Sequence, residues 1–234
     1  MDAILEIAQN HDLTVIEDAA CALGAKYKDK FAGAIGDIGC FSFHARKGIT
    51  TGEGGMLVTN DDEIAQRARE LSTFGTEAGP KRDGAYSPPS FVHLGYNYKM
   101  SDITAAIGVA QLRRLDTIIE QKRNLARYWD SQLDEIKGIK KPYVDSRTFS
   151  IYQSYVALIK PSLDRNKLIQ DLMSNGVQAQ IGTYASHMQP VYASNDTCPN
   201  SKEIFDRAIA LPMFYTLKED DIDYVCNLLK KCLM

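Results

Sequence analysis

The stretch from Val15 to Gly55 reads VIEDAACALGAKYKDKFAGAIGDIGCFSFHARKGITTGEGG and contains the features that decide the fold. The apolar run at residues 13–16 predicts a short buried strand, which ends on the two carboxylates Glu17 and Asp18. Two more apolar runs bounded by glycine-rich turns predict further strands, at residues 40–43 and 56–59. Ligands of open α/β sheets bind beyond the carboxyl ends of the strands, so a binding site is expected there.

Outside this stretch, helical and strand periodicities alternate along the chain. Helices are predicted at residues 1–10, 62–71 after a cap at Asp61, 101–115 after a cap at Ser101, 117–136, 163–174 and 220–233, and strands at 152–159 and 177–181. Residues 75–89 carry glycine, proline and charge without periodicity, which predicts a long surface loop. The alternation implies an α/β fold, with a boundary expected in the segment 138–147.

The composition is that of an ordinary globular protein: 234 residues, 44% hydrophobic, 24% charged, with a formal net charge of −3. This balance gives no electrostatic reason to expect binding to nucleic acid or to an anionic membrane. No apolar run approaches the ~20 residues of a membrane span, so a soluble cytoplasmic protein is expected. The five cysteines form no CxxC pair and the four histidines show no metal-ligand spacing, so neither a disulfide framework nor a metal site is expected.

Three side chains in the central stretch could together bind pyridoxal phosphate (PLP): Asp18, Ser42 and Lys47. This cofactor needs a carboxylate beside its ring nitrogen, donors for its phosphate and a lysine that binds it covalently. A glycine-rich run, residues 50–55, follows the lysine. Each residue alone also has a simpler interpretation, because aspartates often end strands and lysines are usually solvated surface charges. By themselves these residues support a phosphate-binding α/β protein only weakly.

Several sequence blocks, in a fixed order, make the chain similar to a known family. They are IEDAA and ALGA within residues 16–25, GDIG at 36–39, FSFHxxK at 41–47, TGEGGM at 51–56, GYNYKMSD at 95–102 and QLxxLD at 111–116. In these blocks the chain resembles the DegT/StrS group of nucleotide-sugar aminotransferases.

The resemblance implies a fold and an activity. The fold is the α/β fold of type I PLP-dependent transferases, with a three-layer α/β/α large domain and a small α+β domain. Residues 1–137 would be the C-terminal part of the large domain with its connecting helix, and residues 138–234 the small domain. The implied reaction transfers an amino group from an amino-acid donor, glutamate, to a nucleotide-linked keto sugar for polysaccharide biosynthesis. Dehydratase relatives carry histidine in place of Lys47, so its retention favours transamination.

The resemblance also implies roles for individual residues. Lys47 would bind the cofactor covalently and then move protons, Asp18 would pair with the ring nitrogen, and Ser42 would donate to the phosphate. Cys21 stands where the family usually has a glutamine or histidine that contacts the ring hydroxyl. Asn97 matches a residue that reaches the phosphate bound by the partner subunit, which implies a homodimer; it could also be only a turn residue before its helix.

One departure concerns the beginning of the chain. Members of this family carry a long segment before the position of Met1, and that segment contributes strands and phosphate-binding groups. We therefore expect that a separate N-terminal polypeptide completes the site, that the chain is part of a longer product, or that it is a truncated, catalytically incompetent fragment with a structural or regulatory role. Thr183, Tyr184, His187 and Tyr192 occupy the expected substrate-facing loop, although they could equally be ordinary loop and core residues.

Overall fold

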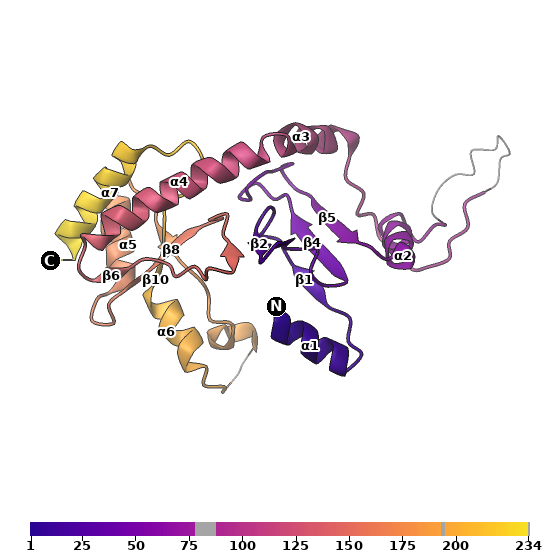
Figure 1. The fold of residues 1–234 in the computed structure, drawn as a ribbon, viewed down its shortest axis with the longest axis horizontal. Coiled ribbons are helices and arrows are strands. Elements are labelled where there is room, and N and C mark those ends of the chain that lie inside the picture. Colours follow the sequence, from indigo (N-terminus) through magenta and orange to yellow (C-terminus); the bar gives the residue numbers. More distant parts are fainter. Residues whose placement is uncertain (78–87, 193–194, 234) are drawn as a thin grey trace. The chain divides into compact units, whose positions relative to one another are not determined.

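The computed structural model describes residues 1–77, 88–192 and 195–233. The chain forms two compact units, and each unit is assembled from two stretches of sequence. Residues 1–116 with 147–149 make the first unit, and residues 117–146 with 150–234 make the second (Figure 1). Assignment of 1–137 and 138–234 to the large and small domains of the family stays a prediction.

The first unit contains three helices and six strands in the part of the chain that the structure describes. They are α1 (Asp2–Asn10), β1 (Ile16–Asp18), β2 (Lys26–Tyr27), β3 (Lys30–Phe31), β4 (Ile38–Ser42), β5 (Gly55–Thr59), α2 (Asp62–Ser72), α3 (Asp102–Leu112) and β7 (Thr148–Phe149). Strands β1, β4 and β5 form one sheet in that order, and β3, β2 and β7 form another. Because β1 runs parallel to β4, their carboxyl ends lie at the same edge of the sheet (Figure 1).

The predicted strand at residues 13–16 is displaced along the chain. Pairing with β4 begins at Ile16, opposite Ile38, and continues to Asp18. The residue before it, Val15, uses its backbone groups in other hydrogen bonds. Its N–H donates to the Asp37 carboxylate at 2.7 Å, and its carbonyl accepts from the N–H groups of residues 37 and 38. The expected burial is also wrong, since Leu13 is 58% exposed.

Two helix starts predicted from capping residues are confirmed. The Asp61 carboxylate accepts hydrogen bonds from the N–H groups of Glu63 and Ile64, and helix α2 begins at the next residue. The Ser101 hydroxyl accepts from the N–H of Thr104 and begins α3. The predicted loop at residues 75–89 falls mostly on positions 78–87, which lie outside the described residues.

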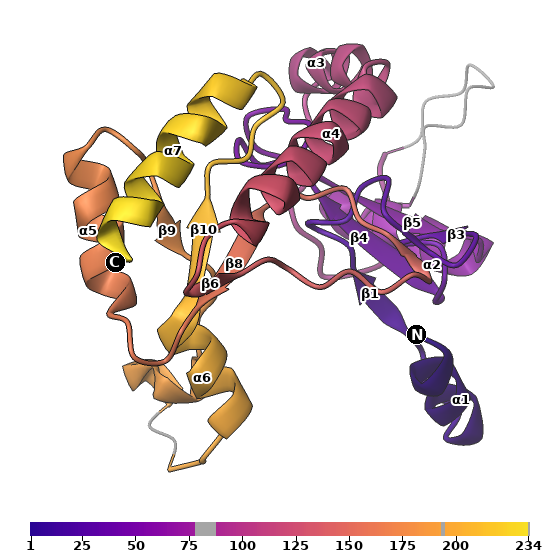
Figure 2. The same cartoon turned by 60° about the vertical axis from the view of Figure 1, so that its left-hand side comes forward.

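The second unit is an antiparallel sheet with helices packed against it. Its elements are α4 (Leu115–Asp134, which starts in the first unit), β6 (Ile139–Lys140), β8 (Tyr155–Ile159), α5 (Arg165–Ser174), β9 (Gln180–Ile181), the 3-10 turns η1 (Ser186–Met188) and η2 (Pro190–Tyr192), α6 (Pro199–Arg207), β10 (Ala208–Leu211) and α7 (Glu219–Cys232). The strand order is β6-β8-β10-β9, and every pairing is antiparallel. Figure 2 shows α5 and α7 side by side, joined by a hydrogen bond from the Tyr224 hydroxyl to the Asn175 carbonyl.

A continuous apolar core lies between this sheet and helices α4, α5 and α7. Strand β8 alternates between fully buried and half-buried side chains, as a strand with one face on the core should. Trp129 of α4 is fully buried, stacks on the Tyr155 ring at 5.6 Å between centroids, and donates its indole N–H to the Pro212 carbonyl. The tryptophan therefore joins the helix to the sheet through both apolar and polar contacts.

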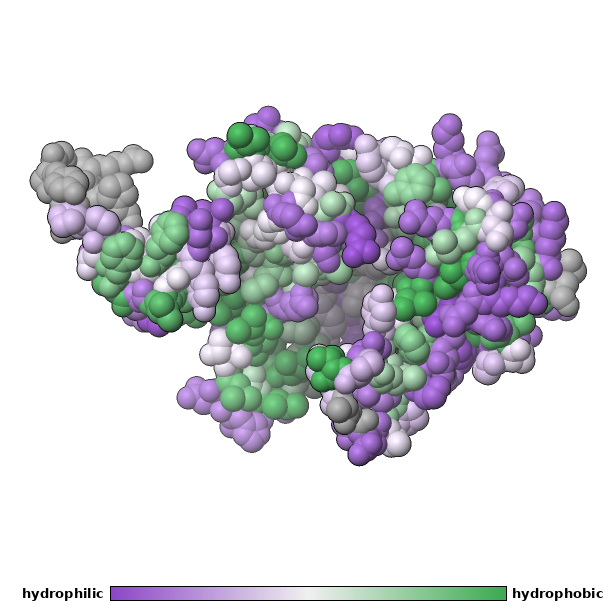
Figure 3. Space-filling view, turned by 180° about the vertical axis from the view of Figure 1, so that it is seen from behind, coloured by the Kyte–Doolittle hydropathy of each residue, from purple (hydrophilic) through white to green (hydrophobic). Residues whose placement is uncertain are grey.

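Many large apolar side chains of the first unit reach the surface. Helix α3 is predominantly apolar, yet it has no buried residue, and Ile103 is 78% exposed. Figure 3 shows apolar residues at the surface on the face opposite to that of Figure 1. Within the described ranges, no helix has both the length and the apolar character that crossing a membrane requires.

Candidate active site

The two carboxylates at the end of β1 have different surroundings. Glu17 is half-buried and accepts three backbone N–H groups, from Gly33 at 2.9 Å, Ile35 at 2.6 Å and Gly36 at 2.7 Å. Asp18 is exposed and accepts from the N–H of Ala20 at 3.1 Å. Successive side chains of a strand point to opposite faces, so Glu17 holds a loop on one face while Asp18 is presented on the other.

Asp18 and Ser42 share one face of the sheet. Asp18 is paired with Cys40 in the parallel register of β1 and β4, and Ser42 lies two residues farther along β4. Directly paired residues and residues two apart point to the same side, so the three side chains line one face near the carboxyl edge. The Ser42 hydroxyl oxygen accepts a weak hydrogen bond from the N–H of His44 at 3.3 Å, which leaves its O–H able to donate elsewhere.

Lys47 lies beyond the end of β4, in the loop that leads to β5. Its Nζ donates to Sγ of Cys21 at 2.9 Å, so the loop and the turn after Asp18 meet at this contact. Lys47 is half-buried and Cys21 is exposed, which leaves the site open to solvent on the cysteine side. The structure thus brings two of the predicted residues into contact, and Asp18 precedes Cys21 by only three positions.

The loop that carries Lys47 is closed on itself by backbone hydrogen bonds. The Phe43 carbonyl accepts from the N–H of Thr51 at 3.0 Å and from the Thr50 hydroxyl at 3.0 Å, and the Phe43 N–H donates to the Gly54 carbonyl at 2.8 Å. Within the loop, Ile49 is 3% exposed and acts as its apolar anchor. The lysine is therefore presented from a short segment whose two ends are joined.

Helix α3 packs against the second half of this loop. The Gln111 carboxamide makes two hydrogen bonds with the backbone of Thr50: its Nε2 donates to the carbonyl at 2.8 Å, and its Oε1 accepts from the N–H at 3.2 Å. One turn earlier, Gly108 comes so close that a Cβ there would lie 2.9 Å from Cγ2 of Thr51, a side chain that is 4% exposed. Sequence analysis assigned no role to Gln111 or to Glu17.

Asn97 lies on a segment that pairs with the end of α2. It forms an isolated antiparallel bridge with Thr73, and its side-chain oxygen accepts from Nζ of Lys99 at 3.1 Å. The same Nζ lies 4.0 Å from the centre of the Phe74 ring. Among the residues described, no hydrogen bond joins Asn97 to Asp18, Ser42 or Lys47, so the structure does not bring this predicted site residue into their cluster.

Close backbone contact holds this Asn97 segment. Gly75 has a positive φ of 77°, and a Cβ on it would meet the His93 carbonyl oxygen at 1.8 Å, so no other residue fits here. Glu70, 6% exposed, lies beneath the segment with its carboxylate 3.0 Å from Nε2 of His93. The segment is thus well fixed although Asn97 itself is exposed.

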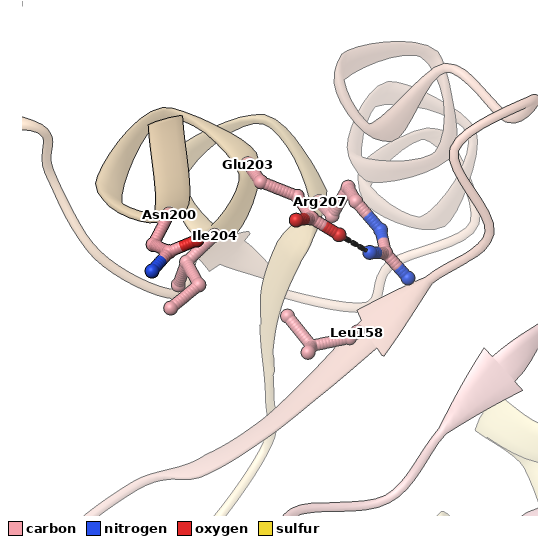
Figure 4. Close-up of a pocket in the computed structure, with 5 residues that line it drawn as sticks. All are labelled: Leu158, Asn200, Glu203, Ile204 and Arg207. Atoms are coloured by element: carbon pink, nitrogen blue, oxygen red, sulfur yellow. Dashed lines mark hydrogen bonds and ion pairs between the residues drawn. The ribbon is translucent and has the colours of Figure 1, made fainter. Parts of the chain in front are cut away.

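The second unit has cavities of its own. One of about 280 Å³ lies between α6 and β8; it is lined by Leu158, Asn200, Glu203, Ile204 and Arg207 (Figure 4). Arg207 forms an ion pair with Glu203 and donates to the Ile159 carbonyl at 2.8 Å, so its charge is already neutralised. His187, from the expected substrate-facing loop, lines another cavity of about 550 Å³. In the described part of the chain, no group of three His, Cys, Asp or Glu side chains could hold a metal ion.

Comparison with known proteins agrees with this architecture. The chain is 35% identical to a GDP-perosamine synthase of Caulobacter vibrioides, over 100% of its own length and 62% of the relative's. It superposes with a TM-score of 0.90 on the aminotransferase TlmJ of Streptoalloteichus hindustanus, at 28% identity, covering 99% of this chain and 61% of that one. A putative sugar aminotransferase, Spr1654 of Streptococcus pneumoniae in its PLP form, gives 0.86 at 25% identity, covering 94% and 57%.

The chain spans about 60% of the length of these proteins. The expected fold class is confirmed, because the chain is mixed α/β and superposes on aminotransferases over nearly its whole length. The match to a sequence family covers residues 1–230. The chain therefore belongs to the DegT/DnrJ/EryC1/StrS aminotransferase family.

Proposed function

We propose that this chain is the catalytic-lysine part of a PLP-dependent aminotransferase that transfers an amino group from glutamate to a nucleotide-linked keto sugar. The proposal depends on one observation above all: Nζ of Lys47 contacts the Cys21 turn at 2.9 Å, at the carboxyl edge where Asp18 and Ser42 share a face. Family membership supplies the reaction class, and the similarity to a GDP-perosamine synthase supports a nucleotide sugar as the acceptor.

The residues present fit the chemical groups of PLP. The exposed carboxylate of Asp18 has an oxygen available for a protonated ring nitrogen, because the hydrogen bond that it accepts within the described part of the chain uses Oδ1. Ser42 retains a hydroxyl proton for a phosphate oxygen, and the amine of Lys47 contacts Cys21, three residues after Asp18. A protonated pyridine ring supplies the electron sink that stabilises negative charge on the substrate carbon.

Each residue then has a distinct task. Lys47 would hold the cofactor, and its Nζ would move a proton at the substrate carbon. Asp18 would keep the ring nitrogen protonated by remaining a carboxylate, Ser42 would bind the phosphate, and Cys21 lies beside the lysine. The loop closure at Phe43 keeps the amine in place between these steps.

The active assembly is proposed to be a homodimer in the cytoplasm, in which Asn97 serves the partner's site. Its exposure and its lack of any hydrogen bond to the Lys47 cluster are consistent with a role outside its own site. A separate N-terminal polypeptide stays a prediction. Co-expression with the matching segment of a close relative tests it, since complementation would raise cofactor affinity.

Borohydride reduction in the presence of PLP tests the central assignment. We expect the reduced cofactor to be found on Lys47 by peptide mass analysis, and Lys47→Ala to abolish both this label and transamination. Lys30→Ala is a matched control, because Lys30 is an exposed residue of β3. A label on another lysine, or label and activity that survive in Lys47→Ala, would contradict the proposal.

A further inference from the structure

Helix α3 contacts the loop that carries Lys47 at two places, and the residue before its cap contacts the loop at a third. Gln111 makes its pair of hydrogen bonds with Thr50, and Gly108 admits the buried Thr51 side chain. Just before the helix, Met100 packs against Gly54, where an added Cβ would lie 2.7 Å from Cε of the methionine. The loop is thus contacted along its second half by α3 and by the residue that precedes the helix cap.

The contact at Gln111 differs in kind from the other two. Packing at Gly108 and Met100 limits how close the loop can come, whereas a carboxamide that both donates to and accepts from one residue fixes its position and orientation. Gln111 is half-buried, so these bonds are partly shielded from competing water. Gly108 and Gln111 are three residues apart and lie on the same face of α3.

The path from Gln111 to the lysine is short. Thr50 donates its hydroxyl to the Phe43 carbonyl, which also accepts from the N–H of the next residue, so a shift of Thr50 weakens the closure of the loop. Lys47 lies between Phe43 and Thr50 in this closed segment, three residues before the threonine. A displacement at Thr50 is therefore expected to move Nζ of Lys47 relative to Cys21.

We propose that Gln111 is a positioning residue for Lys47: its carboxamide fixes Thr50 and thereby the place at which the loop presents the lysine amine. Gln111 touches neither substrate nor cofactor in this role and acts through the loop backbone. The catalytic part of the inference rests on the proposed function of Lys47, whereas the effect on loop geometry does not.

Two variants and one control test the inference. Gln111→Met has a similar length but can neither donate nor accept the two hydrogen bonds. Gly108→Ala favours the helix by about 1 kcal/mol through its propensity, yet pushes against Thr51, so it disturbs the loop without weakening α3. Arg113→Met is the control, because Arg113 is exposed just after the end of the same helix. If Gln111→Met does not fold, Gln111→Glu takes its place, because a carboxylate cannot donate to the Thr50 carbonyl.

The first readouts need no cofactor. Hydrogen exchange at the Thr50 amide should be about 10-fold faster in Gln111→Met, because this N–H loses its acceptor. Acetylation of Lys47 by acetic anhydride, followed by mass spectrometry relative to Lys30, should change at least about threefold in both variants, since the amine loses its fixed contact with Cys21. Rates within twofold of wild type in both variants while the protein stays folded would overturn the inference.

The last readout concerns turnover. Both variants should lower kcat by about 10- to 100-fold, with the KM for the amino donor changing less than about threefold, because misplacement of the amine affects the chemical step. An unchanged kcat alongside altered exchange and acetylation would refute the catalytic part. If wild-type Lys47 is not labelled by borohydride and PLP, the proposed function fails, while the exchange and acetylation results still decide whether Gln111 positions the loop.

Discussion

Each of the two units is stabilised internally by a different kind of contact. In the described ranges, three apolar side chains of the first unit are buried, Ala8, Ala19 and Ile49, whereas the second unit has a continuous core around Trp129 and Tyr155. The first unit instead has polar side chains that form hydrogen bonds with backbone groups far away in the sequence, such as those of Glu17, Asp37 and Gln111. The candidate site lies in the unit with the smaller core.

The contrast has a physical reason. Apolar burial stabilises a fold without direction, at about 25 cal/mol per Å², but it does not fix a side chain at one orientation. Hydrogen bonds such as those of Glu17 to three N–H groups specify position, and each bond to a charged acceptor contributes about 1.5–3 kcal/mol net. A unit built in this way can position a lysine and a carboxylate well while remaining less stable than its neighbour in sequence.

The largest expected effect comes from a comparison of two adjacent carboxylates of the first unit, one expected to act in catalysis and the other in stability. Asp18→Asn should lower transamination at least about 100-fold, because a neutral amide cannot keep the ring nitrogen protonated, and should change the free energy of unfolding by less than about 0.5 kcal/mol. Glu17→Gln should instead lower the free energy of unfolding by about 2–3 kcal/mol with less effect on transamination, because the negative charge is lost and the new amide nitrogen cannot accept the Gly33 N–H. Steady-state kinetics and denaturant unfolding of both variants measure the two effects.

These adjacent residues serve as controls for each other. Activity of Asp18→Asn within a few-fold of wild type would remove Asp18 from its assigned role. An equal loss of stability in both variants would contradict the assignment of a structural role to Glu17 and a catalytic role to Asp18.

A buried lysine provides the next test, in the second unit. Lys122 is 6% exposed, its Nζ donates to the Gln153 carbonyl at 3.3 Å, and burial lowers its pKa to about 8 from an ordinary 10.5. Lys122→Met should raise the free energy of unfolding by about 1–3 kcal/mol at pH 7, because a buried charge is replaced by an apolar side chain of similar length. Unfolding followed by the fluorescence of Trp129, the single tryptophan, measures it.

The sign of the pH dependence follows from the lowered pKa. Below pH 8 the folded chain carries the full cost of the buried ammonium, and between about pH 8 and 10.5 the unfolded state binds more protons than the folded one. Stability of the wild type should therefore rise through that window, and Lys122→Met should lack this rise. Identical pH profiles would show that the ammonium is well solvated in the folded state.

The smallest effect compares the units directly, through two equivalent helix caps. Asp61 accepts from two N–H groups at the start of α2, and Asp164 does the same at the start of α5, with distances of 2.8–3.0 Å in both. Asp61→Ala and Asp164→Ala should each cost about 1 kcal/mol. If the units unfold separately, Trp129 fluorescence will respond to Asp164→Ala and not to Asp61→Ala. An equal response to both would mean that the chain unfolds as one cooperative unit.

The sequence predicted the elements better than the contacts between them. Asp61 and Ser101 signal their helices locally. Ser42 and Lys47 are predicted as site residues from their spacing and from the family blocks. Gln111 belongs to one of those blocks, but a pair of hydrogen bonds across 61 residues leaves no periodic signal. The early start assigned to the strand at residue 13 has a similar cause, because Asp37 binds Val15 from outside the apolar pattern.

The chain passes between the two units three times, at residues 116–117, 146–147 and 149–150. Strand β7 lies in the short segment, residues 147–149, that belongs again to the first unit. Thr148 and Phe149 pair with β2, and the Arg147 carbonyl accepts from the Lys28 N–H at 2.5 Å. A gene fragment that ends near residue 116 would therefore omit one strand of a three-stranded sheet, and a fragment that begins at residue 117 would carry that strand without its partner. For dissection of this protein, a circularly permuted chain or a co-expressed peptide spanning residues 147–149 is a sounder starting point than truncation.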